Sequence, residues 1–184
     1  MIHLLEKYQK EVIPQMMEKF GYKNTMAVPK IEKVVINTGF GKQISGKTSD
    51  EQRKILEAVL DNLTLITGQR SVVTKAKKSI STFKLRKGVP VGAMVTLRGQ
   101  RMRDFLEILI HVTLPRSRDF QGIDQKSFDK KGNLTIGIRE QIAFPEVSPE
   151  KTKNLFGLEI TVVANAKSRE EGMELLRLLG FRIK

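Results

Sequence analysis

Residues 70–88 carry the densest cluster of side chains that could do chemistry. The segment holds seven cations and no acid, with hydroxyl side chains between them. Ammonium and guanidinium groups neutralise phosphate, and hydroxyls form hydrogen bonds with phosphate oxygens. A merely solvated face normally mixes both signs of charge, so this composition favours contact with nucleic acid. The side chains concerned are Arg70, Lys75, Lys77, Lys78, Ser79, Ser81, Thr82, Lys84, Arg86 and Lys87.

We expect residues 70–88 to form a long, extended basic loop that protrudes from the fold. Its cations repel one another when no RNA is present, which predicts a mobile loop that becomes ordered on assembly. If several of these cations neutralise phosphates, binding should weaken steeply as the salt concentration rises.

A second motif supports a different chemistry. The run Gly41-Lys-Gln-Ile-Ser-Gly46-Lys47-Thr48 matches the phosphate-loop pattern G-x-x-x-x-G-K-[ST]. It follows a predicted strand and precedes a predicted helix, which is the context that such a loop requires. Under this alternative the chain is a nucleotide-binding protein that uses Lys47 and Thr48.

Three features weigh against a phosphate loop. Ser49-Asp-Glu-Gln52 is a capping box that starts the helix after the motif, whereas a phosphate loop runs its Lys-Thr directly into the first helical turn. Asp50 and Glu51 place negative charge where a triphosphate would lie. No later predicted strand ends in an Asp that could help to hold magnesium.

The remaining side chains do not support catalysis or metal binding. The chain has no cysteine, and its two histidines are His3, near the start, and His111, inside an apolar run. No serine has a visible His–Asp partnership, and no metal-ligand spacing occurs. We therefore expect a protein that is not an enzyme and has neither a cofactor nor a metal site.

A smaller group of arginines surrounds an apolar segment near residue 105. Asp104, Glu107 and Asp119 dilute it, so helix-end charges and local ion pairs explain the group as well as RNA contact does. The arginines are Arg98, Arg101, Arg103, Arg116 and Arg118.

The overall composition agrees with an anionic partner. The 184 residues carry a formal net charge of +13 at a pI near 10.0, which a globular protein does not need in order to fold. No tryptophan and only two tyrosines are present, so recognition of folded RNA by shape and phosphate is favoured over base stacking. No apolar run approaches the ~20 residues of a membrane span. The absence of cysteine and of a secretory signal fits a cytoplasmic protein.

The hydrophobic periodicity predicts helices and strands in the order α, β, α, β, β, α, β, β, α. Pro14 should kink or divide the first helix, and Pro115 should stop the third. Helices are expected over residues 2–20, 49–67, 102–114 and 168–180, and strands over 31–38, 71–74, 91–98, 133–139 and 157–165.

This order lacks the regular alternation of a doubly wound fold. We expect a two-layer α+β fold in which helices cover one face of one antiparallel sheet of about five strands. Residues 1–184 should form a single domain, with residues 70–88 as its protruding basic loop.

Several runs of residues resemble a known family along essentially the whole chain. They are Val28-Pro-Lys-Ile-Glu-Lys-Val-Val-Ile-Asn37, Gly68-Gln-Arg-Ser-Val-Val-Thr-Lys-Ala-Lys-Lys-Ser79, Val95-Thr-Leu-Arg-Gly99, Leu114-Pro-Arg-Ser-Arg-Asp-Phe120, Gly132-Asn133 and Glu140-Gln-Ile-Ala-Phe-Pro-Glu146. In this order they are similar to bacterial large-subunit ribosomal protein five, the family that binds 5S ribosomal RNA.

The resemblance implies a structural role in the ribosome. Family members bind 5S rRNA through one face of the sheet, help to attach it in the central protuberance and contact 23S rRNA. Their basic loop reaches toward the P-site transfer RNA, and another surface meets a protein in the head of the small subunit. On this resemblance the 5S contact falls on Asn37, Gln69, Arg70, Thr96 and Arg98. The transfer-RNA-facing loop falls on Lys75, Lys77, Lys78, Ser79, Ser81, Thr82, Lys84, Arg86 and Lys87.

The chain departs from the family pattern at a few positions. Thr38-Gly-Phe-Gly41 replaces a usual Met-Gly-Val-Gly, Gln121 replaces a usual Arg, and Lys130-Lys131 stands where Gly-Arg is common. The departures put an RNA contact at Gln121 in doubt and favour a variable loop over residues 41–48. A non-ribosomal RNA chaperone, or a membrane-surface protein that uses the same basic loop, is a further alternative.

Overall fold

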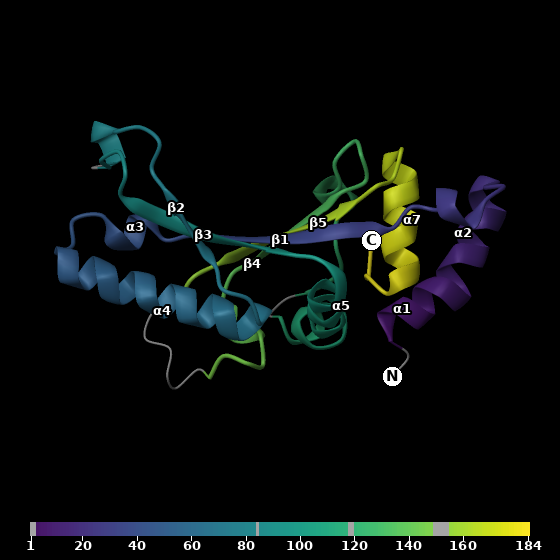
Figure 1. The fold of residues 1–184 in the computed structure, drawn as a ribbon, viewed down its shortest axis with the longest axis horizontal. Coiled ribbons are helices and arrows are strands. Elements are labelled where there is room, and N and C mark those ends of the chain that lie inside the picture. The colour runs from purple at the N-terminus through teal and green to yellow at the C-terminus, as the bar shows by residue number, and fades with distance from the viewer. Residues whose placement is uncertain (1–2, 84, 118–119, 149–154) are drawn as a thin grey trace. The chain divides into compact units, whose positions relative to one another are not determined.

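Among the described residues, the main helices and strands follow one another along the chain in the predicted order (Figure 1). The computed structural model describes residues 3–83, 85–117, 120–148 and 155–184. The strands are β1 (Ile31–Gly39), β2 (Val72–Lys75), β3 (Pro90–Leu97), β4 (Leu134–Ile138) and β5 (Leu158–Ala164). The α-helices are α1 (Leu4–Lys7), α2 (Ile13–Phe20), α3 (Gly41–Ile44), α4 (Ser49–Thr67), α5 (Gly99–Ile108), α6 (Leu114–Arg116) and α7 (Arg169–Leu179).

The five strands form one antiparallel sheet in the order β2-β3-β1-β5-β4. The strands β2 and β3 pair so that Val72 lies opposite Met94 and Thr74 lies opposite Gly92. The predicted α+β class and the single sheet of about five strands are therefore confirmed. The chain divides into two compact units. Unit 1 comprises Met1–Val34, Arg98–Ile136 and Thr161–Lys184, and unit 2 comprises Val35–Leu97 and Gly137–Ile160.

In unit 2, the long helix α4 packs against β3 (Figure 1). The helix buries Ile55, Val59 and Leu63, which are four residues apart and therefore share one face. On β3 the alternate side chains Val95 and Leu97 are buried in return. Each such burial stabilises the fold by about 1.5–3 kcal/mol, so this contact holds the helix to one side of the strand.

In unit 1, α1 contacts α5, and α2 contacts α7. The Lys19 Nζ of α2 and the Glu174 Oε2 of α7 form an ion pair of 2.9 Å. As predicted, α7 begins after Ser168, whose hydroxyl accepts from the Glu171 N–H at 3.2 Å, and ends at Gly180 with a φ of 115°.

Two prolines widen helices instead of ending them. The π-helical turn η1 (Tyr8–Val12) precedes Pro14, and the π-helical turn η4 (Leu109–Thr113) precedes Pro115. Proline has no N–H and its ring pushes away the carbonyl four residues earlier, so a wider turn before it relieves the conflict. Pro14 therefore alters the first helix as expected. Pro115 lies inside the helical segment, which ends one residue later at Arg116.

The helical segment from Gly99 to Arg116 is buried on one side and not all round. Phe105, Leu106 and Leu109 are buried, whereas His111 and Val112 are exposed. The apolar composition of residues 102–114 predicts a helix that is buried nearly all round, and the structure corrects this to burial on one side. A lone exposed Val is normal on a protein surface, because polar side chains are too few to cover it.

Gly92 sets the spacing of the strands that carry the predicted RNA contacts. A Cβ at this position would lie 2.6 Å from the Thr38 carbonyl oxygen and 2.7 Å from the Thr74 Oγ1. The backbone oxygen of Thr38 belongs to β1 and cannot move without disturbing the strand. The absence of a side chain at residue 92 therefore lets the Thr38 carbonyl oxygen and the Thr74 hydroxyl both lie close to the backbone of β3.

Replacing Gly92 with alanine should destabilise the protein, because the added methyl group overlaps a neighbouring strand. We expect a loss of about 1–3 kcal/mol in the free energy of unfolding, measured by urea denaturation. Gly39→Ala is the matched control, since a Cβ there meets nothing within 4 Å. Its effect should stay within about 0.5 kcal/mol. Equal stability of the two variants would contradict the close approach at Gly92.

Candidate RNA-binding surface

Asn37 and Thr96 present polar groups on the side of the unit 2 strands that faces away from the buried side chains. On β1, Ile36 and Thr38 are buried and Asn37 between them is half-buried. On β3, Val95 and Leu97 are buried and Thr96 between them is half-buried. Because side chains alternate along a strand, Thr96 points away from α4.

The polar groups of these two residues are available to a partner. Within the described residues, neither the Asn37 amide nor the Thr96 hydroxyl forms a side-chain hydrogen bond. An amide offers two donors and an acceptor, and a hydroxyl offers both roles. Groups of this kind read sugar hydroxyls and base edges as well as phosphate.

Gln69 and Arg70 follow the end of α4 and lead into β2. The Gln69 Nε2 donates to the Thr96 carbonyl at 3.2 Å, and the Gln69 N–H donates to the Thr67 hydroxyl at 3.3 Å. Gln69 therefore joins this turn to β3 and keeps its Oε1 as an acceptor. Arg70 is exposed. Arg98 is also exposed, as the residue that precedes α5 in unit 1.

A shallow hollow of about 210 Å³ lies beside Asn37 in unit 2. Gly157 and the exposed Glu159 also line it, and the Thr38 hydroxyl donates to the Gly157 carbonyl at 2.8 Å. A carboxylate accepts hydrogen bonds from base amino groups and repels phosphate. The hollow therefore suits a base edge or a ribose better than a phosphate. The sequence interpretation missed Glu159, because only the pairing of β1 with β5 brings it near Asn37.

The basic segment contains more backbone pairing than the sequence predicted. Residues 72–75 form β2, and beyond them the Ala76 N–H donates to the Val89 carbonyl at 2.9 Å. Ile80 and Leu85 exchange two backbone hydrogen bonds of 2.9 and 3.0 Å around the 3-10 turn η3 (Ser81–Phe83). The long extended loop that we expected is thus not shown, because backbone pairing continues past β2. Residues 75–89 are called the basic tip below.

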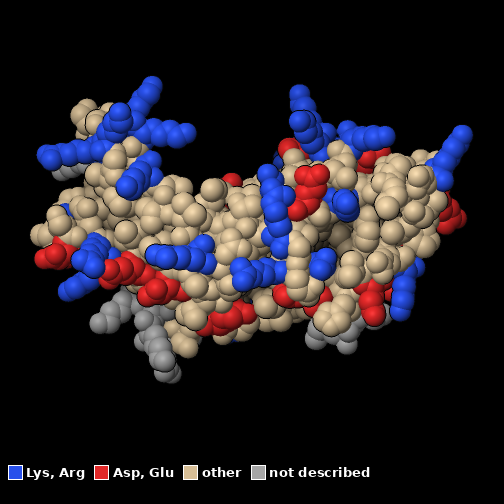
Figure 2. All heavy atoms as spheres, viewed as in Figure 1, with Lys and Arg blue, Asp and Glu red and all other residues tan. Residues whose placement is uncertain are grey.

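The cations of the basic tip are free of acid partners. Figure 2 shows blue side chains gathered over the connection between β2 and β3, at the upper left, with no red among them. Within the described part of the segment, no cation forms an ion pair with a carboxylate. Lys84 lies outside the described residues. The exposed side chains are Arg70, Lys75, Lys77, Lys78, Ser79, Ser81, Thr82, Arg86 and Lys87.

Ser79 also supports the backbone of the tip. Its hydroxyl oxygen accepts from the Lys87 N–H at 2.9 Å, so this side chain joins the two arms. Ile80 and Phe83 lie among the cations with 41% and 67% of their surface exposed. The sequence interpretation missed both residues. Their position in a run without acids is the signal that could have found them, since exposed large apolar side chains often mark binding sites.

The second group of arginines is not explained by ion pairs. Among the described residues, Arg98, Arg101, Arg103 and Arg116 form no salt bridge, and Arg118 lies outside the described residues. The Arg103 Nη2 donates to the Gln100 Oε1 at 2.7 Å. These arginines belong to unit 1.

The motif at Gly41–Thr48 consists of the short helix α3, a turn and the N-cap of α4. Thr48, and not Ser49, is the N-cap of α4, and the Glu51 Oε2 accepts from the Thr48 N–H at 3.0 Å and from its hydroxyl at 2.9 Å. These hydrogen bonds, the backbone one first, lower the pKa of Glu51. A carboxylate is a stronger acceptor than the Gln52 amide, which accounts for a box that begins one residue earlier than predicted.

This cap weighs against the phosphate-loop alternative. The Thr48 hydroxyl is already donated to a carboxylate, and that carboxylate occupies the helix N-terminus where a phosphate would bind. The Gln52 Nε2 donates to the Lys47 carbonyl at 2.9 Å, which holds the preceding turn in the same arrangement. Among the described residues, no group of three or more His, Asp or Glu side chains could hold a metal ion.

The chain matches ribosomal proteins over almost its whole length. Residues 24–86 match the family model of ribosomal protein L5, and residues 90–183 match that of the ribosomal L5P family C-terminus. It is 52% identical over 180 residues to large ribosomal subunit protein uL5 of Thermoanaerobacter sp. (strain X514), covering 98% of this chain and 97% of the relative. It is 50% identical over 177 residues to uL5 of Halothermothrix orenii and 53% identical over 177 residues to uL5 of Desulfatibacillum aliphaticivorans, with 96% of each chain covered.

These matches define the class as structural ribosomal proteins, whose partners are ribosomal RNA and other ribosomal proteins. The chain belongs to the ribosomal protein L5 family. It is therefore a part of the ribosome and not an enzyme. In the part of the chain that the structure describes, no helix is both long and apolar enough to cross a membrane.

Replacing Thr48 with alanine should shorten or loosen the first turn of α4, because the N-cap is lost. We expect a loss of about 1 kcal/mol in the free energy of unfolding at neutral pH. Ser49→Ala is the control, since Ser49 lies inside the helix, and it should be near neutral. The pKa of Glu51 is lowered in the folded protein. The difference in the free energy of unfolding between the Thr48 and Ser49 variants should therefore be largest at neutral pH and shrink as the pH falls through that lowered pKa. A larger loss in the Ser49 variant would contradict the assignment of the cap.

Proposed function

We propose that this chain binds 5S rRNA and helps to attach it in the central protuberance of the large ribosomal subunit. In this proposal it also contacts 23S rRNA, the P-site transfer RNA and a protein in the head of the small subunit. The observation that carries the proposal is the presence in unit 2 of two surfaces with different chemistry. One is a polar strand face around Asn37 and Thr96, and the other is the cationic basic tip.

The polar face suits specific recognition of 5S rRNA. Asn37 and Thr96 lie on strands, whose backbones are held by neighbouring strands and by α4, so their orientation is set before RNA binds. Gln69 supports β3 through the Thr96 carbonyl and keeps an acceptor. Arg70, which lies shortly before β2, and Arg98, which follows β3, add positive charge that neutralises phosphate.

The basic tip suits a less specific contact with transfer RNA. Its exposed lysines and arginines neutralise phosphates without reading sequence. Phe83 adds a flat apolar surface that can lie against a base or a ribose, a contact that tolerates any sequence.

We also propose that residues 1–184 act as one domain, because β1, β4 and β5 each run from one unit into the other.

Replacing Lys75, Lys77 and Lys78 together with alanine should spare 5S binding and weaken the transfer-RNA contact. We expect 5S affinity in a filter-binding titration to change by less than about threefold, and P-site transfer RNA to dissociate faster from ribosomes assembled with the variant. For any RNA bound through the tip, the slope of log affinity against log salt should fall by about 2.

Two controls separate charge from contact in this prediction. Changing Lys23, Lys126 and Lys130 to alanine removes the same charge from exposed positions in unit 1. Phe83→Ala removes no charge and should weaken the transfer-RNA contact without changing the salt slope. Complete loss of 5S binding in the triple tip variant, but not in the control, would refute the division of labour between the two surfaces.

The Asn37→Ala/Thr96→Val double variant should lose 5S affinity, because RNA groups that bond these side chains would be left without partners. Each RNA group that is left without a hydrogen-bond partner costs about 1–3 kcal/mol. We therefore expect the 5S affinity to fall about tenfold or more in a mobility-shift titration. Thr96→Val keeps both the shape and the carbonyl that Gln69 uses. Thr64→Val is the control, since this exposed hydroxyl on α4 donates to the Leu60 carbonyl at 2.7 Å. Unchanged 5S affinity in the double variant would refute the polar face as the binding surface.

A further inference from the structure

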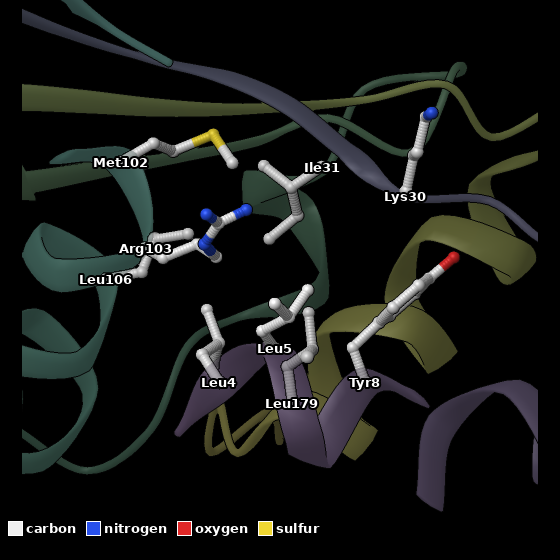
Figure 3. A pocket seen from close by; sticks show the side chains of 9 residues that line it. All are labelled: Leu4, Leu5, Tyr8, Lys30, Ile31, Met102, Arg103, Leu106 and Leu179. Atoms are coloured by element: carbon white, nitrogen blue, oxygen red, sulfur yellow. The ribbon is translucent and has the colours of Figure 1, made fainter. Parts of the chain in front are cut away.

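An apolar groove of about 140 Å³ lies in unit 1, and none of the residues that line it is among those assigned to RNA (Figure 3). Leu4 and Leu5 of α1, Ile31 at the start of β1, Leu106 of α5 and Leu179 at the end of α7 line it. In Figure 3 the side chains of these leucines and of Ile31 point toward one another around the opening. The groove is therefore built from four segments that are far apart in the sequence.

The size of the groove suits a single side chain. A cavity of about 150 Å³ lined by aliphatic side chains accommodates one benzene molecule, so this groove can accept one Leu or Phe side chain. Leu4, Leu106 and Leu179 are nearly fully buried, whereas Leu5 has 43% of its surface exposed. The floor is thus part of the core, and Leu5 gives the groove one exposed apolar wall.

One cation faces the groove without an anion. In Figure 3 the Arg103 guanidinium lies across the opening and points toward Ile31, and Lys30 lies at the far rim. Among the described residues, neither of these cations forms an ion pair. The two acids of α5 have other partners: the Asp104 Oδ1 accepts from the Gln100 Nε2 at 2.7 Å, and the Glu107 Oε1 is occupied by the Leu4 N–H at 2.7 Å and by the His3 Nδ1 at 3.4 Å. The groove therefore lacks a negative charge that a partner can supply.

The lining favours a peptide over RNA. A nucleobase needs hydrogen-bonding groups along its edge or an aromatic surface to stack on. The only aromatic side chain among the residues of this groove is Tyr8, and its hydroxyl already donates to the Pro29 carbonyl at 3.2 Å. An aliphatic floor beside an unpaired guanidinium instead complements an apolar side chain next to a carboxylate.

We propose that this groove binds an acidic peptide segment of a neighbouring protein. One Leu or Phe side chain of that segment fills the groove, and a carboxylate beside it pairs with Arg103. The contact is separate from the RNA-binding surfaces of unit 2, and it gives this otherwise cationic chain a site for a protein partner.

The proposal can be tested on the full chain by NMR titration of methyl groups with the peptide acetyl-Gly-Asp-Phe-Glu-Gly-amide. The signals of Leu4, Leu5, Ile31 and Leu179 should shift on binding. A peptide with Asn and Gln in place of the acids should bind about fivefold more weakly, because it lacks the ion pair. A peptide with Ala in place of Phe should produce no shifts at these methyl groups.

Two variants locate the binding site. Arg103→Gln should reduce the affinity for the acidic peptide about fivefold and leave the neutral peptide unaffected. Leu5→Ser should abolish the shifts, while Leu65→Ser, at an exposed leucine on α4, should not. The proposal is overturned if millimolar acidic peptide leaves these methyl signals unchanged, or if the neutral peptide binds equally well. It is also overturned if oligouridine shifts the same signals more strongly, which would assign the groove to RNA.

Discussion

The alternation of side chains along β1 and β3 is the constraint on which the proposed RNA-binding surface depends. Successive residues of a strand point to opposite sides, so burying Val95 and Leu97 against α4 forces Thr96 to the other side. Asn37 is placed in the same way between the buried Ile36 and Thr38. A shift of one residue in either strand would bury the polar groups and expose the apolar ones, so the core enforces the register that the RNA-facing side requires. Gly92 keeps these strands close together because it has no side chain to separate them.

Unit 2 also separates charges that would otherwise cancel. The exposed outer surface of α4 carries Asp50, Glu57 and Asp61, and the basic tip carries lysines and arginines without any acid. On α4 the acids are partly balanced by the helix itself, since the Arg53 Nε pairs with the Glu57 Oε1 at 2.9 Å. Among the described residues of the tip, no cation forms such a pair with a carboxylate. The carboxylate of Glu51 has a separate, local role, because it holds the first turn of α4 and thereby excludes a phosphate from Gly41–Thr48.

The units differ in what their surfaces offer to partners. The polar strand face and the basic tip of unit 2 present hydrogen-bonding groups and cations, which suit folded RNA. The groove of unit 1 presents aliphatic side chains and one unpaired guanidinium, which suit a peptide. A ribosomal protein has both kinds of partner, and the composition of the chain shows only the first, because a net charge of +13 reflects the majority of its surface.

Local patterns in the sequence determined the order and type of the helices and strands, the ends of α4 and α7 at Gly68 and Gly180, and the absence of acids from residues 70–88. These features depend on short-range periodicity and on residues within one turn of one another, so they can be read without the fold. Tertiary structure alone decided which polar side chains stay free of partners, why Gly92 has no side chain and how four distant segments form the groove beside Arg103. The cap of α4 was misplaced by one residue for a local reason, because Thr48 and Ser49 have similar preferences and the Glu51 carboxylate three residues after Thr48 is the better acceptor. Contacts between residues far apart in the chain depend on packing, which local sequence patterns do not encode.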